Sequence, residues 1–188
     1  GMCVNSKYVV ETINDVTRVY NKDGTPASAV VDLNTFYGYP AQVDRTTGSV
    51  GPFVTDPSCL YDNATQRWFM VILTLDQDPS TGAFLGSNHL DIAVSQTSSP
   101  IGAWNIYSLP VQDNGTAGTP NHRCSAGPCL GDYPHIGADA NGFYITTNEY
   151  SFFGPEFHGA QIYAFSKAAL AQGASSVFVS QFDSHGLD

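Results

Sequence analysis

Three segments of this 188-residue chain follow one local plan, and this repeat restricts the possible folds more than any other feature of the sequence. Each segment has a short run typical of a strand, a tight polar turn, and a second run that opens near an aromatic residue. The segments are MCVNSKYVVETIND (2–15), PSCLYDNATQRWFMVILTL (57–75) and PHIGADANGFYITTNEY (134–150). Repeated hairpins of this kind predict an all-β protein built from equivalent units.

The repeat can be aligned residue by residue. The aromatic residues at the matching position are Tyr8, Trp68 and Phe143, and the turn residues are Asn5, Asp62 and Asp139. A third β-type run follows each hairpin, at 17–20, 90–95 and 161–165, and a fourth follows at 28–33, 104–109 and 176–182. Each unit is therefore predicted to be a four-stranded antiparallel sheet.

Such units in series are typical of a β-propeller, whose blades are four-stranded sheets. We expect a partial propeller of about three blades within one segment, residues 1–188, with blades at about 2–34, 55–110 and 132–183. Because a closed propeller needs roughly four to eight blades, open blade edges predict association between copies of the chain. A two-sheet β-sandwich is the alternative, since it also contains many short strands.

Two further features complete the predicted architecture. The segment from Ser166 to Gly173 is the one clear helix signal, with serine at its start and glycine at its end. The longest predicted loops are 34–55 and 110–131, and each leads into the first strand of the next blade. Propellers commonly place binding residues at the rim formed by such loops.

The charge of the chain excludes some partners. Its net charge is −10, with only seven Lys plus Arg. Such a surface repels phosphate groups, so we expect no nucleic-acid partner and no association with anionic membranes. No stretch approaches the roughly 20 apolar residues that span a bilayer.

Four cysteines suit an oxidising compartment, which predicts an extracellular or periplasmic protein. Cys124 and Cys129 bracket a short loop that a local disulfide can close, and Cys3 and Cys59 would then form the other pair. Three pairings are possible, and the sequence does not choose among them. A zinc site is the competing interpretation, but no C-x-x-C motif or suitably spaced histidine supports it.

The entries to the second and third predicted blades contain the candidate catalytic residues. They read VTDPS around Asp56 and GDYPHI around Asp132. The residue just before an inner propeller strand points to the central channel, so these two carboxylates are expected to converge on one axial pocket. The alternative for each is an Asp that only caps a turn.

These entries carry a resemblance to a known family. TDPSCLYDNATQRWFMV and GDYPHIGADANGFYITTNEYS resemble the second-blade and third-blade motifs of five-bladed arabinanase and xylosidase-type glycoside hydrolases (family 43-like). The resemblance implies that Asp132 is the general acid and that Asp56 orients it and tunes its pKa. Two features depart from the family, which uses Glu as its acid and places its general base at a first-blade entry that would here fall before Gly1.

A second resemblance covers more of the chain and implies less. The repeat plan, with the run HLDIAVSQTSSPIGAWNIYSLP, is similar to secreted bacterial propeller proteins without an assigned activity. Glu149, at the end of a strand in the third blade, is a further carboxylate expected near the same rim. A solvated strand end is the alternative for Glu149.

Several residues in the expected rim suit sugar binding, since exposed aromatic side chains can stack on a sugar ring. The candidates are Tyr133, His135, Tyr37, Tyr39 and Phe152, with Phe153 beside the last of them. Packing within their own loops is the alternative. The remaining histidines, which have no partner at ligand spacing, are His89, His122, His158 and His185.

Two functions follow from these observations. The first is an extracellular glycoside hydrolase-like propeller that acts on polysaccharide, and the second is a non-catalytic propeller that binds a glycan or a protein at its rim. No cofactor or metal is predicted. The loop from Asp76 to Gly82 has oxygens suited to Ca²⁺, but the same residues are equally good turn formers.

Overall fold

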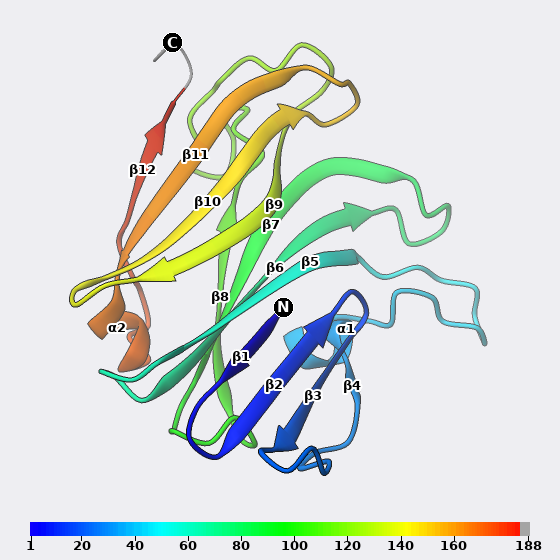
Figure 1. Cartoon of the computed structure of the whole chain (residues 1–188). Coiled ribbons are helices and arrows are strands. Elements are labelled where there is room, and N and C mark those ends of the chain that lie inside the picture. Colours follow the sequence, from blue (N-terminus) through cyan, green and yellow to red (C-terminus); the bar gives the residue numbers. More distant parts are fainter. Residues whose placement is uncertain (185–188) are drawn as a thin grey trace.

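A computed structural model describes residues 1–184 of the chain, and these residues form three four-stranded antiparallel sheets (Figure 1). The strands of each sheet follow one another in the order of the sequence. The first sheet contains β1 (Met2–Val4), β2 (Tyr8–Ile13), β3 (Val16–Asn21) and β4 (Val31–Asp32). The second contains β5 (Phe53–Asp62), β6 (Arg67–Gln77), β7 (Phe84–Ser95) and β8 (Trp104–Pro110). The third contains β9 (Cys129–Ala138), β10 (Gly142–Ser151), β11 (Phe157–Ser166) and β12 (Val179–Asp183).

The second sheet lies between the other two, and its first strand, β5, contacts both β1 and β9 (Figure 1). The three repeated units of the sequence are thus confirmed as separate four-stranded sheets, rather than as strands of two facing sheets. The described sheets do not close into a ring. What is confirmed is therefore an all-β fold of three repeated sheets, and the propeller stays a prediction.

The central position of the second sheet explains the composition of β6. Side chains alternate between the two faces of a strand, and both faces of this sheet are covered. Trp68 and Met70 pack toward the first sheet, while Phe69 and Val71 pack toward the third. A strand buried on both faces needs apolar residues at every position, and the run WFMVIL meets this need.

The predicted turn residues all act in the same way. A carboxylate or amide oxygen of Asn5, Asp62 and Asp139 accepts a backbone N–H from two or three residues further on. Such side-chain bonds mimic a backbone turn and explain why the three hairpins reverse at these residues.

The expectation for Tyr8 was wrong by one residue. Trp68 and Phe143 are each the second residue of the strand that follows their turn, and both face the preceding sheet. In the first hairpin Tyr8 is the first residue of that strand, so Val9 is the true equivalent. Tyr8 instead packs toward the cluster around Trp68.

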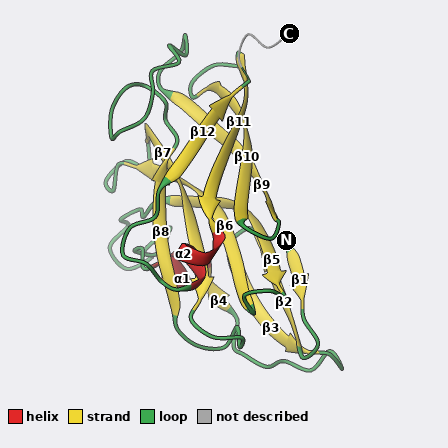
Figure 2. Cartoon of the chain, turned by 90° about the vertical axis from the view of Figure 1, so that its left-hand side faces the viewer, coloured by secondary structure: helices red, strands yellow, loops and turns green. Residues whose placement is uncertain are grey.

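Two short helices flank the sheets (Figure 2). The predicted helix is confirmed as α2 (Lys167–Ala171), where the Ser166 hydroxyl accepts the Ala169 N–H and Gly173 follows with a φ of 70°. Lys167 is buried and donates to Asp62, which ties α2 to the hairpin turn of the second sheet.

The other helix, α1 (Leu33–Tyr37), lies where the sequence predicted a loop. Asp32 caps its first turn, and Gly38 ends it in the left-handed conformation with a φ of 82°. Because Asp32 turns the chain into the helix, the fourth strand of the first sheet is shorter than the expected 28–33.

Both disulfides are present, and they settle the pairing that the sequence left open. Cys3–Cys59 joins β1 to β5, and so links the first two sheets. Cys124–Cys129 closes the short loop that precedes β9. The cysteine pairs leave no thiol for the zinc site considered from the sequence.

The outer faces of the first and third sheets are uncovered in the single chain. Apolar side chains exposed there include Met2, Val4 and Ile13 on the first sheet, and Ile162 and Phe182 on the third. Association between copies through these faces stays a prediction. No helix within residues 1–184 has the length and apolar character needed to cross a membrane.

Candidate functional site

Both β5 and β9 contain a bulge at the proline that follows the predicted catalytic position. Asp56 and Pro57 together stand opposite one residue of β6, and Tyr133 and Pro134 stand opposite one residue of β10. Proline has no N–H to donate to a ladder, so the strand must depart from regular pairing there. The bulges turn the backbone of Asp56 and Tyr133 to positive φ values of 51° and 52°.

A positive φ is unusual for residues other than glycine, and such strain is found preferentially at functional positions. Asp tolerates this conformation better than most residues, but Tyr does not. The two bulges also show that the predicted carboxylates are not equivalent. Asp56 lies within its bulge, whereas Asp132 precedes Tyr133 and matches Thr55.

Hydrogen bonds from the first sheet hold Asp56 in place. The Asp56 N–H donates to Asn14 Oδ1 at 3.2 Å, and Asn14 Nδ2 donates to Thr55 Oγ1 at 3.1 Å. The Thr55 hydroxyl then donates to Asp56 Oδ1 at 3.1 Å. Sequence reasoning missed Asn14, because nothing in its local context shows that it meets a strand 41 residues away.

Asp132 lies close enough to Asp56 for the two carboxyl groups to interact. Partial burial, and then the negative charge of Asp56, raise the pKa of Asp132. The strands themselves meet here, since the Ser58 hydroxyl donates to the Pro134 carbonyl oxygen at 2.7 Å. The structure therefore places the two predicted catalytic carboxylates on adjoining strands, within range of a charge interaction, and the axial pocket expected for them stays a prediction.

Aromatic side chains lie beside this pair. Tyr133 is 53% exposed, and His135 is also exposed. Their rings meet edge to face, with centroids 4.7 Å apart. The result is an open surface that combines a carboxyl pair with an exposed aromatic ring.

The raised pKa of Asp132 predicts a pH-dependent difference between the wild type and the Asp132→Asn variant. A carboxyl whose pKa is higher in the folded state stabilises the fold below its unfolded pKa, near 3.8, and this stabilisation is lost as pH rises. We expect the Asn variant to gain up to about 1 kcal/mol over the wild type between pH 4 and pH 7, the scale of a partly exposed charge pair. Urea denaturation of both proteins at several pH values measures this difference. The contributions of groups that titrate alike in the two proteins cancel from it. A difference that is flat with pH would contradict the raised pKa of Asp132.

Glu149 does not belong to this surface. Its side chain is fully buried between β10 and the loop that joins β8 to β9, so it is not the solvated strand end that the sequence allowed. His122 Nδ1 lies 3.0 Å from both Glu149 oxygens and 3.5 Å from Asp113 Oδ2. Burial and the adjacent Asp113 carboxyl raise the pKa of Glu149 to about 9. Glu149 is thus removed from the candidate catalytic set.

The other predicted sugar-binding residues make their contacts with other groups. Tyr37 is buried in α1 and is not a rim residue. The Tyr39 hydroxyl donates a hydrogen bond to Asp91 Oδ2 at 2.8 Å and lies 2.9 Å from His89 Nε2. Phe152 has its ring contacts with Phe84 and Phe153, in an aromatic group of the rim.

The sequence showed no partner for His89 or His122, and the structure gives each of them one. His89 lies in β7, where its ring is within 3.3 Å of the buried Asp91 carboxylate. A signal was present in the run NHLDIAV, since an Asp at an inward position of an apolar strand must have a partner. His122 does lie in a loop, but it meets Glu149. His185 lies outside the described residues.

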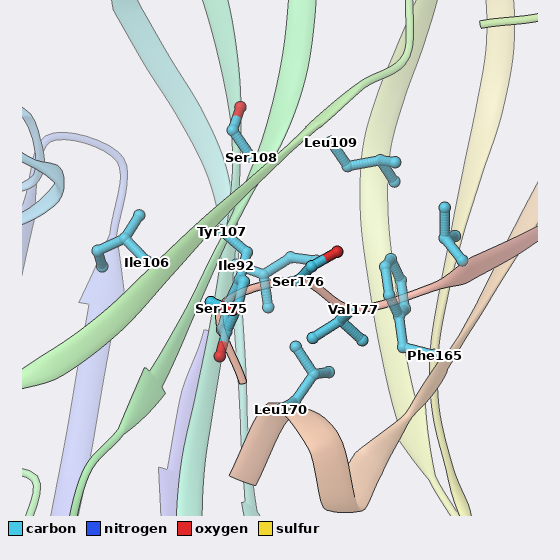
Figure 3. A pocket seen from close by; sticks show the side chains of 11 residues that line it. Ile92, Ile106, Tyr107, Ser108, Leu109, Phe165, Leu170, Ser175, Ser176 and Val177 are labelled. Carbon is cyan, nitrogen blue, oxygen red and sulfur yellow. The ribbon is translucent and has the colours of Figure 1, made fainter. Parts of the chain in front are cut away.

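A pocket lies between the outer strands of the second and third sheets (Figure 3). Its volume is about 390 Å³, and Phe165 and Leu170 lie on the side formed by β11 and α2. Its other lining residues are Ile92, Ile106, Tyr107, Ser108, Leu109, Ser175, Ser176, Val177 and Val179. No carboxylate or histidine lines it, so it offers shape without acid–base chemistry.

The loop considered for Ca²⁺ uses its oxygens internally. Asp78 Oδ1 accepts the N–H groups of Ser80 and Thr81 and the Thr81 hydroxyl. Asp76 Oδ2 accepts the Ser87 hydroxyl at 2.5 Å. These bonds are those of a turn, which was the alternative interpretation of this loop.

Comparisons with models of protein families, with curated proteins and with solved structures find no match to this chain.

Proposed function

We propose that this chain is an extracellular carbohydrate-binding protein, and that its binding surface is formed by Asp56, Asp132, Tyr133 and His135. One observation carries the proposal: two neighbouring carboxyl groups lie beside a Tyr that is exposed and held at positive φ. A non-glycine residue at positive φ costs free energy, and such backbone strain is found preferentially at functional sites.

The chemistry of the surface fits a neutral glycan. Carboxylate oxygens accept hydrogen bonds from sugar hydroxyl groups, and an aromatic ring packs against the apolar face of a sugar. The net charge of −10 disfavours anionic polymers. The two disulfides support an oxidising compartment such as the cell exterior, where polysaccharides are the abundant ligands.

Titration calorimetry with arabino- and xylo-oligosaccharides tests this proposal, since the sequence resembles enzymes that act on such polymers. We expect Tyr133→Ala to weaken binding roughly tenfold, which corresponds to about 1.4 kcal/mol of lost stacking. Phe178→Ala is the matched control, because Phe178 is 82% exposed and precedes β12, at the opposite edge of the same sheet. Equal affinities for wild type and Tyr133→Ala, or no binding by the wild type, would refute the proposed surface.

The raised pKa of Asp132 favours a second candidate function, glycoside hydrolysis. A general acid must hold its proton near the working pH, and both burial and Asp56 act in this direction. Hydrolysis also needs a carboxylate on the other side of the sugar. Asp56 is the one carboxylate of residues 1–184 whose charge raises the pKa of Asp132. It is therefore the candidate for the second carboxylate.

Aryl arabinosides and xylosides distinguish the two functions. If the protein is an enzyme, the wild type releases the aryl group and Asp132→Asn loses at least a hundredfold in kcat, the scale of general acid catalysis. If it is a binding protein, the wild type shows oligosaccharide binding without turnover. Activity that survives in Asp132→Asn would exclude Asp132 as the acid.

A further inference from the structure

Neither carbohydrate binding nor hydrolysis explains the buried group formed by Asp113, His122 and Glu149. Asp113 and His122 come from the loop between β8 and β9, and Glu149 comes from β10. This loop runs beside the ends of β10 and β11, where the Phe152 and Phe153 N–H groups donate to Pro128 and Ala126 (Figure 1). The three side chains therefore join a long loop to the third sheet.

Three carboxyl groups surround one imidazole in this group. Asp113 and Glu149 are both fully buried, and Asp183 adds a third carboxylate 3.7 Å from His122 Nε2. Within residues 1–184, His122 is the basic side chain that forms an ion pair with Asp113 and Glu149. Buried carboxyl groups need a proton, a base or a cation as a partner, and a single cation can serve Asp113 and Glu149 together.

One oxygen of the group has no partner. Asp113 is fully buried, and its Oδ1 accepts no hydrogen bond from any residue in 1–184. A buried carboxylate oxygen without a donor is rare in proteins, and an ion is one of the few explanations. Asp113 also has a positive φ of 31°, so the backbone takes an unusual conformation where it presents this carboxylate.

The distances fit the coordination shell of a small cation. Two atoms bound to one tetrahedral zinc ion at about 2.0 Å lie about 3.3 Å apart. His122 Nδ1 lies 3.0 Å from Glu149 Oε1 and 3.5 Å from Asp113 Oδ2. One ligand atom from each of the three residues can be chosen so that all lie within 4.8 Å of one another.

The surroundings hold these ligands in the manner of a metal site. A metal-binding imidazole commonly turns its second nitrogen to a carboxylate, and His122 Nε2 faces Asp183 in this way. The ligating carboxylates of such sites are also hydrogen-bonded from behind, and Gln181 Nε2 donates to Asp113 Oδ2 at 2.7 Å. Gln181 is held in turn by Gln161 Oε1.

We infer that Asp113, His122 and Glu149 bind a divalent transition-metal ion of the zinc type. One imidazole with two carboxylates suits Zn²⁺ better than Ca²⁺, which prefers six to eight oxygen ligands. The ion would give Asp113 Oδ1 a partner. It would also fix the β8–β9 loop against the third sheet, so its role is structural and independent of the carbohydrate surface.

Protein stripped with EDTA and titrated with ZnCl₂ in a calorimeter tests this inference. We expect one Zn²⁺ per chain, and an increase in Tm of about 5–10 °C when free zinc exceeds Kd by a hundredfold. His122→Ala is expected to weaken binding at least a hundredfold. His89→Ala is the matched control, because His89 is also a partly buried histidine beside a buried Asp, and it should bind Zn²⁺ like the wild type.

X-ray absorption at the zinc edge provides a readout that does not depend on a variant. The inference requires nitrogen and oxygen neighbours and no sulfur, since both nearby cysteines are in a disulfide. It is overturned if the stripped wild type binds no Zn²⁺ at millimolar concentration, or binds Ca²⁺ but not Zn²⁺. It is also overturned if folded His122→Ala binds as tightly as the wild type, or if sulfur appears in the coordination shell.

Discussion

Replacing Cys3 and Cys59 together by alanine is expected to lower the free energy of unfolding by about 4 kcal/mol, because the disulfide restricts the conformations of the unfolded chain. The two cysteines are 56 residues apart, and the bond joins the first two sheets. A long loop loses much entropy when it is closed, so its cross-link destabilises the unfolded state strongly. Urea denaturation of the double variant under oxidising conditions measures the loss.

The second disulfide is the matched control for this prediction. Cys124 and Cys129 are only five residues apart, so the same relation gives about 2 kcal/mol for the corresponding double alanine variant. The difference between the two variants is therefore more informative than either value. If the Cys124–Cys129 variant proves to be the less stable of the two, loop entropy is not the main contribution of Cys3–Cys59.

Phe143→Ala is expected to lower the free energy of unfolding by about 4 kcal/mol, the typical cost of removing a buried ring and leaving a cavity. Phe143 is fully buried between the second and third sheets. Its ring stacks on Phe69 with centroids 4.7 Å apart, and it also lies near Phe165. Thermal and urea denaturation of the variant measure the effect.

A second substitution separates packing from a general loss of apolar area. Phe178→Ala removes the same ring from an exposed position and should change stability by less than about 0.5 kcal/mol. If Phe143→Ala costs as little as this control, the second and third sheets do not pack through Phe143, and the arrangement of the sheets is wrong.

Much of the fold was predictable because it depends on local patterns. The turns at Asn5, Asp62 and Asp139 follow from side chains that bond to the backbone two or three residues away. The helix at Ser166 follows from a cap of the same kind. The error at Tyr8 shows the limit, because a one-residue difference in turn length moves an aromatic side chain to the other face of its strand.

The helix α1 could have been found but was not. Asp32 and Gly38 are typical start and stop signals, and they enclose one helical turn. The segment is short and follows a strand, so its apolar residues carry no clear helical period. Packing of Leu33 and Tyr37 against the second sheet stabilises the turn, and this contact is not visible in the local sequence.

The residues of the candidate sites were likewise predictable only where they depend on local sequence. Asp56 and Asp132 were identified because they stand at the entries to the second and third predicted blades and match the motifs of the family that the sequence resembles. Their convergence on one pocket is an expectation from the repeat, and it stays a prediction. Glu149 was assigned to the same site, since the sequence alone places it near the same rim and does not show whether its side chain faces solvent or the interior.

The sequence by itself determined the repeated strand units, their hairpin turns, the C-terminal helix and a short choice of disulfide pairings. Each of these depends on residues close together in the chain or on a simple period. Only the tertiary structure decided that His122 meets Glu149 across 27 residues, and that Asn14 meets Asp56 across 42. Such contacts depend on how whole sheets and long loops pack, and local propensity carries no information about distances of that kind.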